Sequence, residues 1–160
     1  MTASFAAGAS LVLAGSFAAS SSFVSDKKRL IRHTEAVLGL ISHVRTDIDH
    51  FLTPVGGLFE DFRNDDLESC GFSSILREKG LDAAVCSQTA SLTEETQEIL
   101  RCFSSALGRS YKEEQLRICD YCTVRISEEL AREREKLKRD LGTYRFAPLI
   151  FALFIILCFL

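Results

Sequence analysis

Apolar residues recur at helical spacing through most of this chain, and they predict helices rather than strands. The clearest stripe runs from about Asp26 to Leu52 in steps of three, four and seven, and it predicts one long helix there. The apolar members of this stripe are Leu30, Val37, Ile41, Val44, Ile48 and Phe51. Clusters of β-branched residues separated by turn dipeptides, which are typical of sheets, are missing from the sequence. The pattern therefore predicts an all-α fold.

Proline and glycine divide the next part of the chain into shorter helices. Pro54 ends the first helix and is expected to open a short second one. The apolar residues of this second helix are Leu58, Phe59 and Phe62. A loop or frayed turn is expected over 64–71, followed by short helices over 74–79 and 81–85 with a break at Gly80.

Two longer helices complete the middle of the chain. Ser91 or Thr93 is expected to cap the first, which ends at Gly108. Ser110 is expected to cap the second, which has no helix breaker before Gly142. The apolar stripe of this last helix consists of Leu116, Cys119, Ile126, Leu130, Leu137 and Leu141. The middle of the chain thus predicts a small bundle of about six helices.

Charges of both signs crowd residues 128–140 of the last helix. Glutamate and arginine recur there four residues apart, as in the pairs Glu128 with Arg132 and Glu135 with Arg139. Such a run is typical of a solvated helix face, and a face that docks a partner is the alternative interpretation.

All charged side chains lie between Asp26 and Arg145, which leaves an uncharged segment at each end of the chain. A charge at the centre of a bilayer costs roughly 3 kcal/mol, so uncharged ends are what membrane insertion requires. We expect transmembrane helices over 3–24 and 142–160 and a bundle domain over 26–141. Lys and Arg flank both segments on the side of the bundle, so the bundle is expected in the cytoplasm, at the cell membrane.

Neither terminal segment is an ideal membrane span. The first lacks a basic start, so a cleaved signal peptide is its weaker interpretation. Small residues follow one face of this segment and favour packing against another membrane helix. They are Ser4, Gly8, Gly15, Ala19 and Ser22. The apolar stretch 146–160 reaches only ~22 Å as a helix against a hydrocarbon core of ~30 Å, so it needs the preceding turn to span; a half-inserted anchor is the alternative.

Candidate chemical groups are few. A net charge of −3 disfavours nucleic acid as the partner. Cys119 and Cys122 form half of a zinc site, and we interpret them as core-filling residues of a reduced cytoplasmic domain. His43, Asp47 and His50 share a helical face that permits a metal, but that face is expected to look toward solvent. Motifs for phosphate, dinucleotide or nucleophile chemistry are missing from the sequence, so a noncatalytic protein without metal or cofactor is predicted.

Short sequence features along the chain carry a resemblance to a known family. The segment LGRSYKEEQL occupies residues 107–116, preceded by the pairs Asp47-Ile48 and Thr53-Pro54 and followed by Tyr144-Arg145. In order and spacing these features resemble the stage III sporulation protein AB family of endospore-forming bacteria. The resemblance implies a component of the channel between mother cell and forespore, with a soluble part similar to the six-helix cytoplasmic domain of the type II secretion platform protein.

The same resemblance implies a platform that docks a cytoplasmic secretion-type ATPase, stage III sporulation protein AA, beside other channel membrane proteins. Self-association of the chain is compatible with this role. The residues expected to bind a partner are Arg109, Tyr111, Glu113, Glu114, Arg132 and Arg134. Three alternatives remain: a generic two-span adaptor, a membrane-bound thiol or metal protein, and a dimerisation element whose last helix forms a coiled coil.

Overall fold

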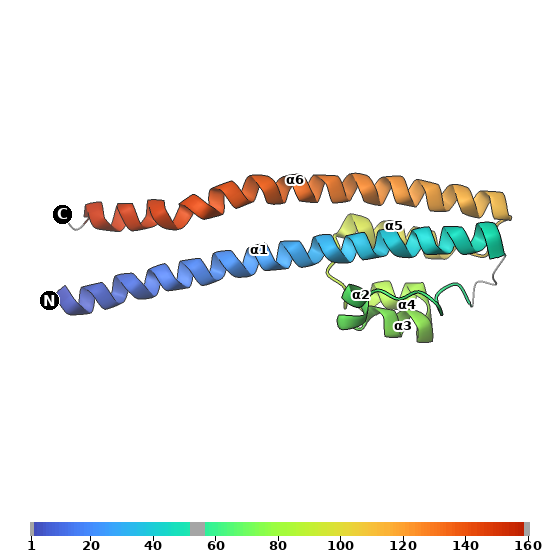
Figure 1. The fold of residues 1–160 in the computed structure, drawn as a ribbon, viewed down its shortest axis with the longest axis horizontal. Helices are drawn as coiled ribbons and strands as arrows, with labels where there is room; N and C mark the ends of the chain where they lie inside the picture. The colour runs from blue at the N-terminus through green and yellow to red at the C-terminus, as the bar shows by residue number, and fades with distance from the viewer. Residues whose placement is uncertain (1, 52–56, 159–160) are drawn as a thin grey trace. The chain divides into compact units, whose positions relative to one another are not determined.

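The computed structural model describes the backbone of residues 2–51 and 57–158 and the side chains of residues 22–50 and 57–141. Six α-helices and no strand occur in these ranges, which confirms the all-α prediction (Figure 1). The helices are α1 (Thr2–Thr46), α2 (Asp65–Ser69), α3 (Phe72–Lys79), α4 (Leu81–Cys86), α5 (Glu94–Ala106) and α6 (Lys112–Cys158). A single π-helical turn, η1 (Asp47–Phe51), follows α1.

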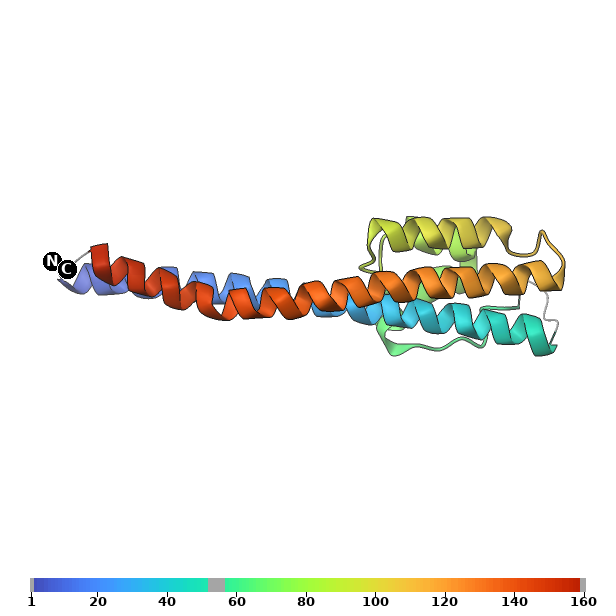
Figure 2. The same cartoon turned by 90° about the horizontal axis from the view of Figure 1, so that it is seen from above.

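The chain divides into two compact units, one of residues 29–132 and one of residues 1–28 with 133–160. The larger unit holds α2 to α5 whole, together with the adjoining parts of α1 and α6. Within it, α1, α5 and α6 lie side by side and the short helices α2 to α4 pack beneath α1 and α5 (Figures 1 and 2). This unit contains the hydrophobic core and the candidate site described below.

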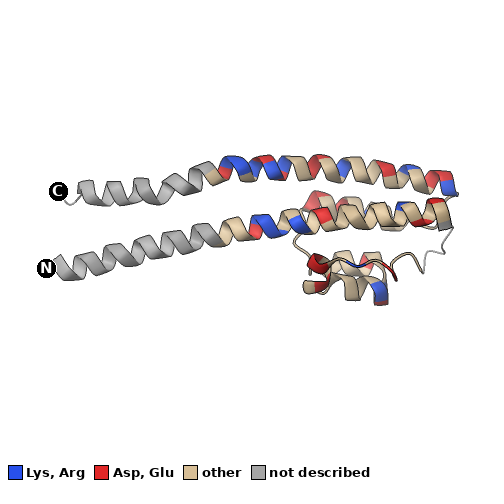
Figure 3. Ribbon diagram, in the orientation of Figure 1, with Lys and Arg blue, Asp and Glu red and all other residues tan. Residues whose placement is uncertain are grey.

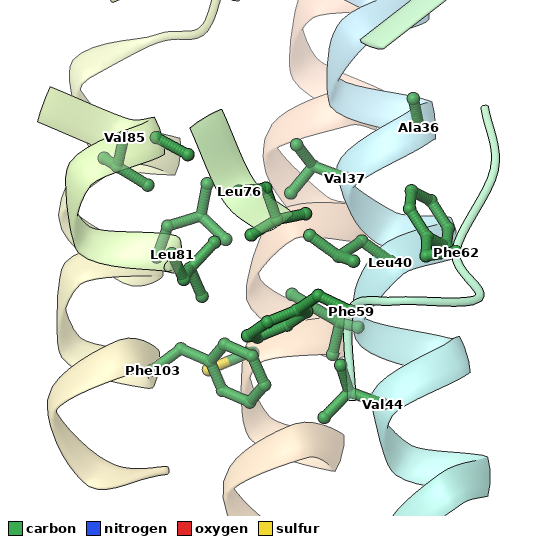
Figure 4. Packing of buried hydrophobic residues seen from close by; sticks show 14 of the residues in the cluster. Ala36, Val37, Leu40, Val44, Phe59, Phe62, Leu76, Leu81, Val85 and Phe103 are labelled. Atoms are coloured by element: carbon green, nitrogen blue, oxygen red, sulfur yellow. The ribbon is translucent and has the colours of Figure 1, made fainter. Parts of the chain in front are cut away.

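The core of the larger unit forms around the apolar stripe of α1. Val37, Ile41, Val44 and Ile48 are buried, as the spacing predicts, and Leu30 is partly buried. The side chain of the sixth member of the stripe, at position 51, lies outside the described residues. Figure 4 shows how side chains from different elements meet in this core. Those labelled are Ala36, Val37, Leu40 and Val44 of α1, Phe59 and Phe62 of the following segment, Leu76 of α3, Leu81 and Val85 of α4, and Phe103 of α5.

The prediction of a helix around Leu58 to Phe62 is wrong. Residues 57–60 form a turn, in which the N–H of Glu60 donates to the carbonyl of Gly57 at 3.2 Å, and residues 62–64 are irregular. Leu58, Phe59 and Phe62 are nevertheless all buried. These three residues are apolar because they are buried, whatever the backbone conformation. An apolar pattern this short does not distinguish a helix from a turn.

The loop or frayed turn predicted over residues 64–71 contains the five-residue helix α2. The side chain of Asn64 accepts hydrogen bonds from the N–H groups of Asp66 (3.1 Å) and Leu67 (3.2 Å), which caps the helix. Asp65 and Asp66 stand in its first turn, where the helix dipole favours negative charge. Leu67 is fully buried and attaches the turn to the core.

The remaining boundaries agree closely with the sequence pattern. Helix α3 starts two residues earlier than expected, at Phe72, and the break at Gly80 and the helix that follows it are confirmed. Thr93, one of the two expected caps, caps α5 by accepting from the N–H of Thr96 at 3.2 Å. The expected cap of the last helix, Ser110, lies one residue too early: the carbonyl of Tyr111 accepts the first helical hydrogen bond of α6.

The charged face predicted over residues 128–140 is partly wrong. Glu129 and Glu133 are buried, with 6% and 4% of their surface exposed. In the smaller unit, Glu133 accepts from Lys27 at 3.1 Å and from Lys136 at 2.6 Å. Burial by itself would raise the pKa of Glu133, but the hydrogen bonds from these two lysines outweigh it and lower the pKa below its usual range.

Among residues 22–50 and 57–141, whose side chains are described, no helix has both the length and the hydropathy needed to cross a bilayer. The predicted spans over 3–24 and 142–160 fall mostly outside the residues whose side chains are described, since these begin at 22 and end at 141.

Candidate functional site

The α5–α6 turn, residues 107–111, is the part of the LGRSYKEEQL segment that links two helices. Helix α5 ends at Ala106, and the N–H of Leu107 donates back to the carbonyl of Phe103 at 3.0 Å. Gly108 then takes a left-handed φ of 75°, which glycine adopts without steric cost. The N–H of Arg109 donates to the carbonyl of Ala106 at 3.3 Å. The turn therefore has one defined backbone path.

Gln115, in the first turns of α6, holds the α5–α6 turn from the side. Its Nε2 donates to the carbonyl of Ser110 at 2.7 Å, and its Oε1 accepts from the N–H of Gly108 at 3.4 Å. The Gln115 amide thus satisfies one backbone N–H and one backbone carbonyl of the turn. Such groups in a turn lack the backbone partners that a helix or sheet would provide. Sequence reasoning did not single out Gln115, although its place in the LGRSYKEEQL segment was the available signal.

Two ion pairs attach the start of α6 to the end of α1. Lys112 lies 3.1 Å from the Asp49 carboxylate and also donates to the backbone carbonyl of Asp49 in η1. The contact of the Lys112 ammonium with the Asp49 side chain, rather than the bond to the backbone, lowers the pKa of Asp49 below its usual value. Two turns further along α6, Asp120 accepts from Arg45 at 2.7 Å. Nothing in the sequence pattern indicated either contact, because both join residues more than sixty positions apart.

Four of the predicted partner-binding residues cluster at this turn and project outward. Tyr111 is 92% exposed, and Arg109, Glu113 and Glu114 are also exposed. Within the described part of the chain, none of these four side chains forms a hydrogen bond or an ion pair. A rigid backbone therefore presents one aromatic ring and three uncompensated charges to the surroundings. They remain predicted partner-binding residues.

Arg132 and Arg134 do not join this cluster. Arg132 lies roughly 27 Å along α6 from Glu114, at 1.5 Å per residue. Its guanidinium is engaged inside the larger unit, at 2.9 Å from Glu95 of α5 and 2.8 Å from the buried Glu129. Arg134 belongs to the smaller unit. Figure 3 shows how charged residues of both signs follow α6 over this length.

A groove of about 380 Å³ adjoins the α5–α6 turn. Leu107 of the turn contributes to its wall, together with Leu76, Leu81 and Phe59 from the core and the exposed Lys79. The groove places apolar surface next to the charged cluster, a combination found in protein–protein contact surfaces. Its residues come from segments far apart along the chain, so no local sequence pattern predicts it.

The cysteine pair Cys119 and Cys122 fills the core, as predicted. Both are buried, with 0% and 2% of their surface exposed. Burial raises the pKa of Cys119 to about 11 and that of Cys122 to about 12. A thiol needs to lose its proton to attack a substrate or bind zinc, so these values weigh against the thiol and metal alternatives.

The expectation that the helical face of His43, Asp47 and His50 looks toward solvent holds for His50, which is exposed, and is wrong for His43 and Asp47. Their side chains are only 29% and 16% exposed, with His43 Nε2 lying 3.6 Å from the Asp47 carboxylate. The His43 ring also packs against Phe62, with centroids 5.6 Å apart. Within the described ranges, no group of three His, Cys, Asp or Glu side chains is placed to hold a metal ion.

A profile of the stage III sporulation protein AB family matches residues 6–160 of this chain. The matched region contains all of the larger unit, all but the first five residues of the smaller unit, and the whole α5–α6 turn. It confirms the resemblance carried by the LGRSYKEEQL segment. Comparison with curated proteins gives no match, and neither does comparison with solved structures.

Proposed function

This chain belongs to the stage III sporulation protein AB family, and from that premise we propose that it is a noncatalytic, membrane-anchored component of the channel between mother cell and forespore. Its helical bundle acts as a platform on which a cytoplasmic secretion-type ATPase, the stage III sporulation protein AA of that system, docks. The bundle does so by binding, without chemistry of its own.

Membrane anchoring is supported by the distribution of charge along the sequence. Residues 3–24 and 146–160 carry no ionic group, and Lys and Arg flank both segments. Two anchors on one bundle restrict it to the vicinity of the bilayer, which raises its effective concentration for partners in the same membrane. In this arrangement the bundle faces the mother-cell cytoplasm, where an ATPase has its nucleotide.

The observation that carries the docking role is the construction of the α5–α6 turn. Gln115 holds its backbone and Lys112 attaches the start of α6 to Asp49. By contrast, Arg109, Tyr111, Glu113 and Glu114 are exposed and have no partner among the described residues. A preorganised surface loses little conformational entropy on binding, and an exposed tyrosine beside arginine is typical of residues that contribute most to affinity. Because the turn directly precedes α6, a docked partner would contact the helix that carries the second predicted span.

Affinity measurements with single-residue variants test this role. The full-length chain is reconstituted in lipid nanodiscs and titrated with the purified ATPase, using biolayer interferometry. Tyr111→Ala and Arg109→Glu are each expected to weaken binding by at least about tenfold, as for central contact residues.

The matched control is Arg101→Glu, which reverses an equally exposed arginine on α5 that has no ion pair within the described residues. We expect this variant to bind as the unaltered chain does. Failure of the unaltered chain to bind the ATPase would contradict the docking role, and equal losses in all three variants would move the contact away from the turn.

A further inference from the structure

A second groove, of about 320 Å³, lies between α5 and the middle of α6. Its floor is apolar and consists of Ile99 and Cys122, which are 9% and 2% exposed. Cys102 and Tyr121 also line it, and the Tyr121 ring is 62% exposed. A large aromatic ring therefore stands in solvent beside an apolar floor.

The charges around this groove do not cancel. Arg125 is compensated, because it lies 2.9 Å from Glu95 and 3.7 Å from Glu128. Glu98, which also lines the groove, is exposed and has no hydrogen bond or ion pair among the described residues. Among the residues that line the groove, two carboxylates, those of Glu95 and Glu98, stand against one guanidinium, that of Arg125.

We propose that this groove binds an arginine side chain presented by a partner protein. The aliphatic part of such a side chain covers Ile99 and Cys122, as long charged residues cover apolar surface elsewhere. The planar guanidinium stacks on the Tyr121 ring and donates hydrogen bonds to the Glu98 carboxylate. Arginine fits these three features together better than lysine does, because a compact, strongly hydrated ammonium stacks poorly on a ring.

An arginine site in this groove would add a second contact to the docking role proposed above. It rests on that role only in assigning the arginine to a partner protein. The groove shares no residue with the α5–α6 turn or with the groove beside Leu107. Recognition of guanidinium and docking of the ATPase at the turn can therefore fail separately. A probe that carries only a guanidinium group distinguishes the two.

Cys102 supplies a reporter inside the groove, since it is exposed and lines the wall. The full-length chain is equilibrated, in a redox buffer, with four small disulfides that differ in their end group: guanidinium, ammonium, hydroxyl or carboxylate. Mass spectrometry of the peptide containing Cys102 then measures how much of each is captured. We expect guanidinium to exceed hydroxyl by about fivefold or more, with ammonium between them and carboxylate lowest.

Three substitutions assign the preference to the groove. Glu98→Gln is expected to remove most of the advantage of guanidinium over hydroxyl, and Tyr121→Leu to remove its advantage over ammonium. Glu94→Gln is the matched control: it deletes an exposed carboxylate one turn earlier on α5 that does not line the groove, and it is expected to change nothing. All three positions are exposed, so the fold persists.

The exposed Cys86 of α4 serves as an internal reference, because its capture ratios should be the same in every variant. The proposal is overturned if guanidinium shows no advantage at Cys102. It is equally overturned if Glu98→Gln leaves that advantage intact or if Glu94→Gln reduces it as much, since either result would place the attraction in the general charge of α5.

Discussion

His33 of α1 accepts a hydrogen bond at Nδ1 from the backbone N–H of Ser91, at a distance of 2.8 Å. His33 is 3% exposed, and burial is the main cause that lowers its pKa, with the nearby Arg29 and Arg32 acting in the same direction and Asp66 opposing them. A ring nitrogen that accepts a hydrogen bond carries no proton. The neutral form of one histidine therefore attaches the segment before α5 to α1.

This relationship predicts that the bundle loses stability in mild acid. Because the pKa of His33 is lowered in the folded chain, the unfolded chain binds more protons once the pH falls below about 6.5, and stability then declines until the lowered folded-state pKa is passed. Thermal unfolding of the full-length chain, followed by circular dichroism at about pH 7.5 and about pH 5.5, measures the loss.

The control for this prediction is His33→Asn, whose Oδ1 can accept from the Ser91 N–H but does not titrate. The variant is expected to be less stable at both pH values, because Asn fills less volume, and to show a smaller difference between them. An undiminished difference would mean that other groups cause the acid sensitivity.

Removal of the Gln115 side chain is expected to loosen the α5–α6 turn. Gln115→Ala deletes two hydrogen bonds to the turn backbone and should lower the free energy of unfolding by about 1–2 kcal/mol. It should also weaken ATPase binding, because the turn loses its preorganisation. Gln97→Ala is the matched control, since Gln97 donates to the carbonyl of Leu92 at 3.2 Å before α5 in a similar way. This control should cost stability but leave binding unchanged.

Arg132 is expected to act in stability rather than in docking at the turn. Arg132→Ala leaves the carboxylate of Glu129, only 8% exposed, without its hydrogen-bond partner and should measurably lower the free energy of unfolding. Arg139→Ala removes a pair whose two side chains are each 74% exposed and should cost less than about 0.5 kcal/mol. Chemical denaturation measures both. Equal losses of unfolding free energy in the two variants would show that the burial of Glu129 does not strengthen its ion pair with Arg132. Loss of ATPase affinity in Arg132→Ala would instead place Arg132 in the docking surface.

Alkylation should separate four cysteines of the bundle into two classes. Cys86 and Cys102 are exposed and should react with maleimide within minutes near neutral pH. Cys119 and Cys122 should stay protected in the folded chain, because they are buried and their pKa values are raised to about 11 and about 12. Quantitative mass spectrometry with and without denaturant checks this order. Fast labelling of Cys122 in the folded chain would contradict the structure of the core.

Periodicity anticipated the parts of the fold that local chemistry controls. The apolar stripe of α1 predicted the burial of Val37, Ile41 and Val44, and glycine positions predicted the ends of α3 and α5. Local signals were also present where the interpretation missed a helix, since Asn64 with the acidic residues after it marks the start of α2. The segment around Phe59 had no such signal, because a buried turn and a buried helix share the same apolar spacing.

By itself, the sequence determined the helical class, most helix boundaries, the two uncharged ends, and the family to which the LGRSYKEEQL segment pointed. The tertiary structure decided which polar side chains are paired: among the residues whose side chains are described, Tyr111 and Arg109 have no partner, whereas Arg132 is held by Glu95 and Glu129. It also decided the grooves and the contact of His33 with Ser91. The physical reason is that helix formation depends on residues three or four positions apart, whereas ion pairing and burial depend on residues that only folding brings together.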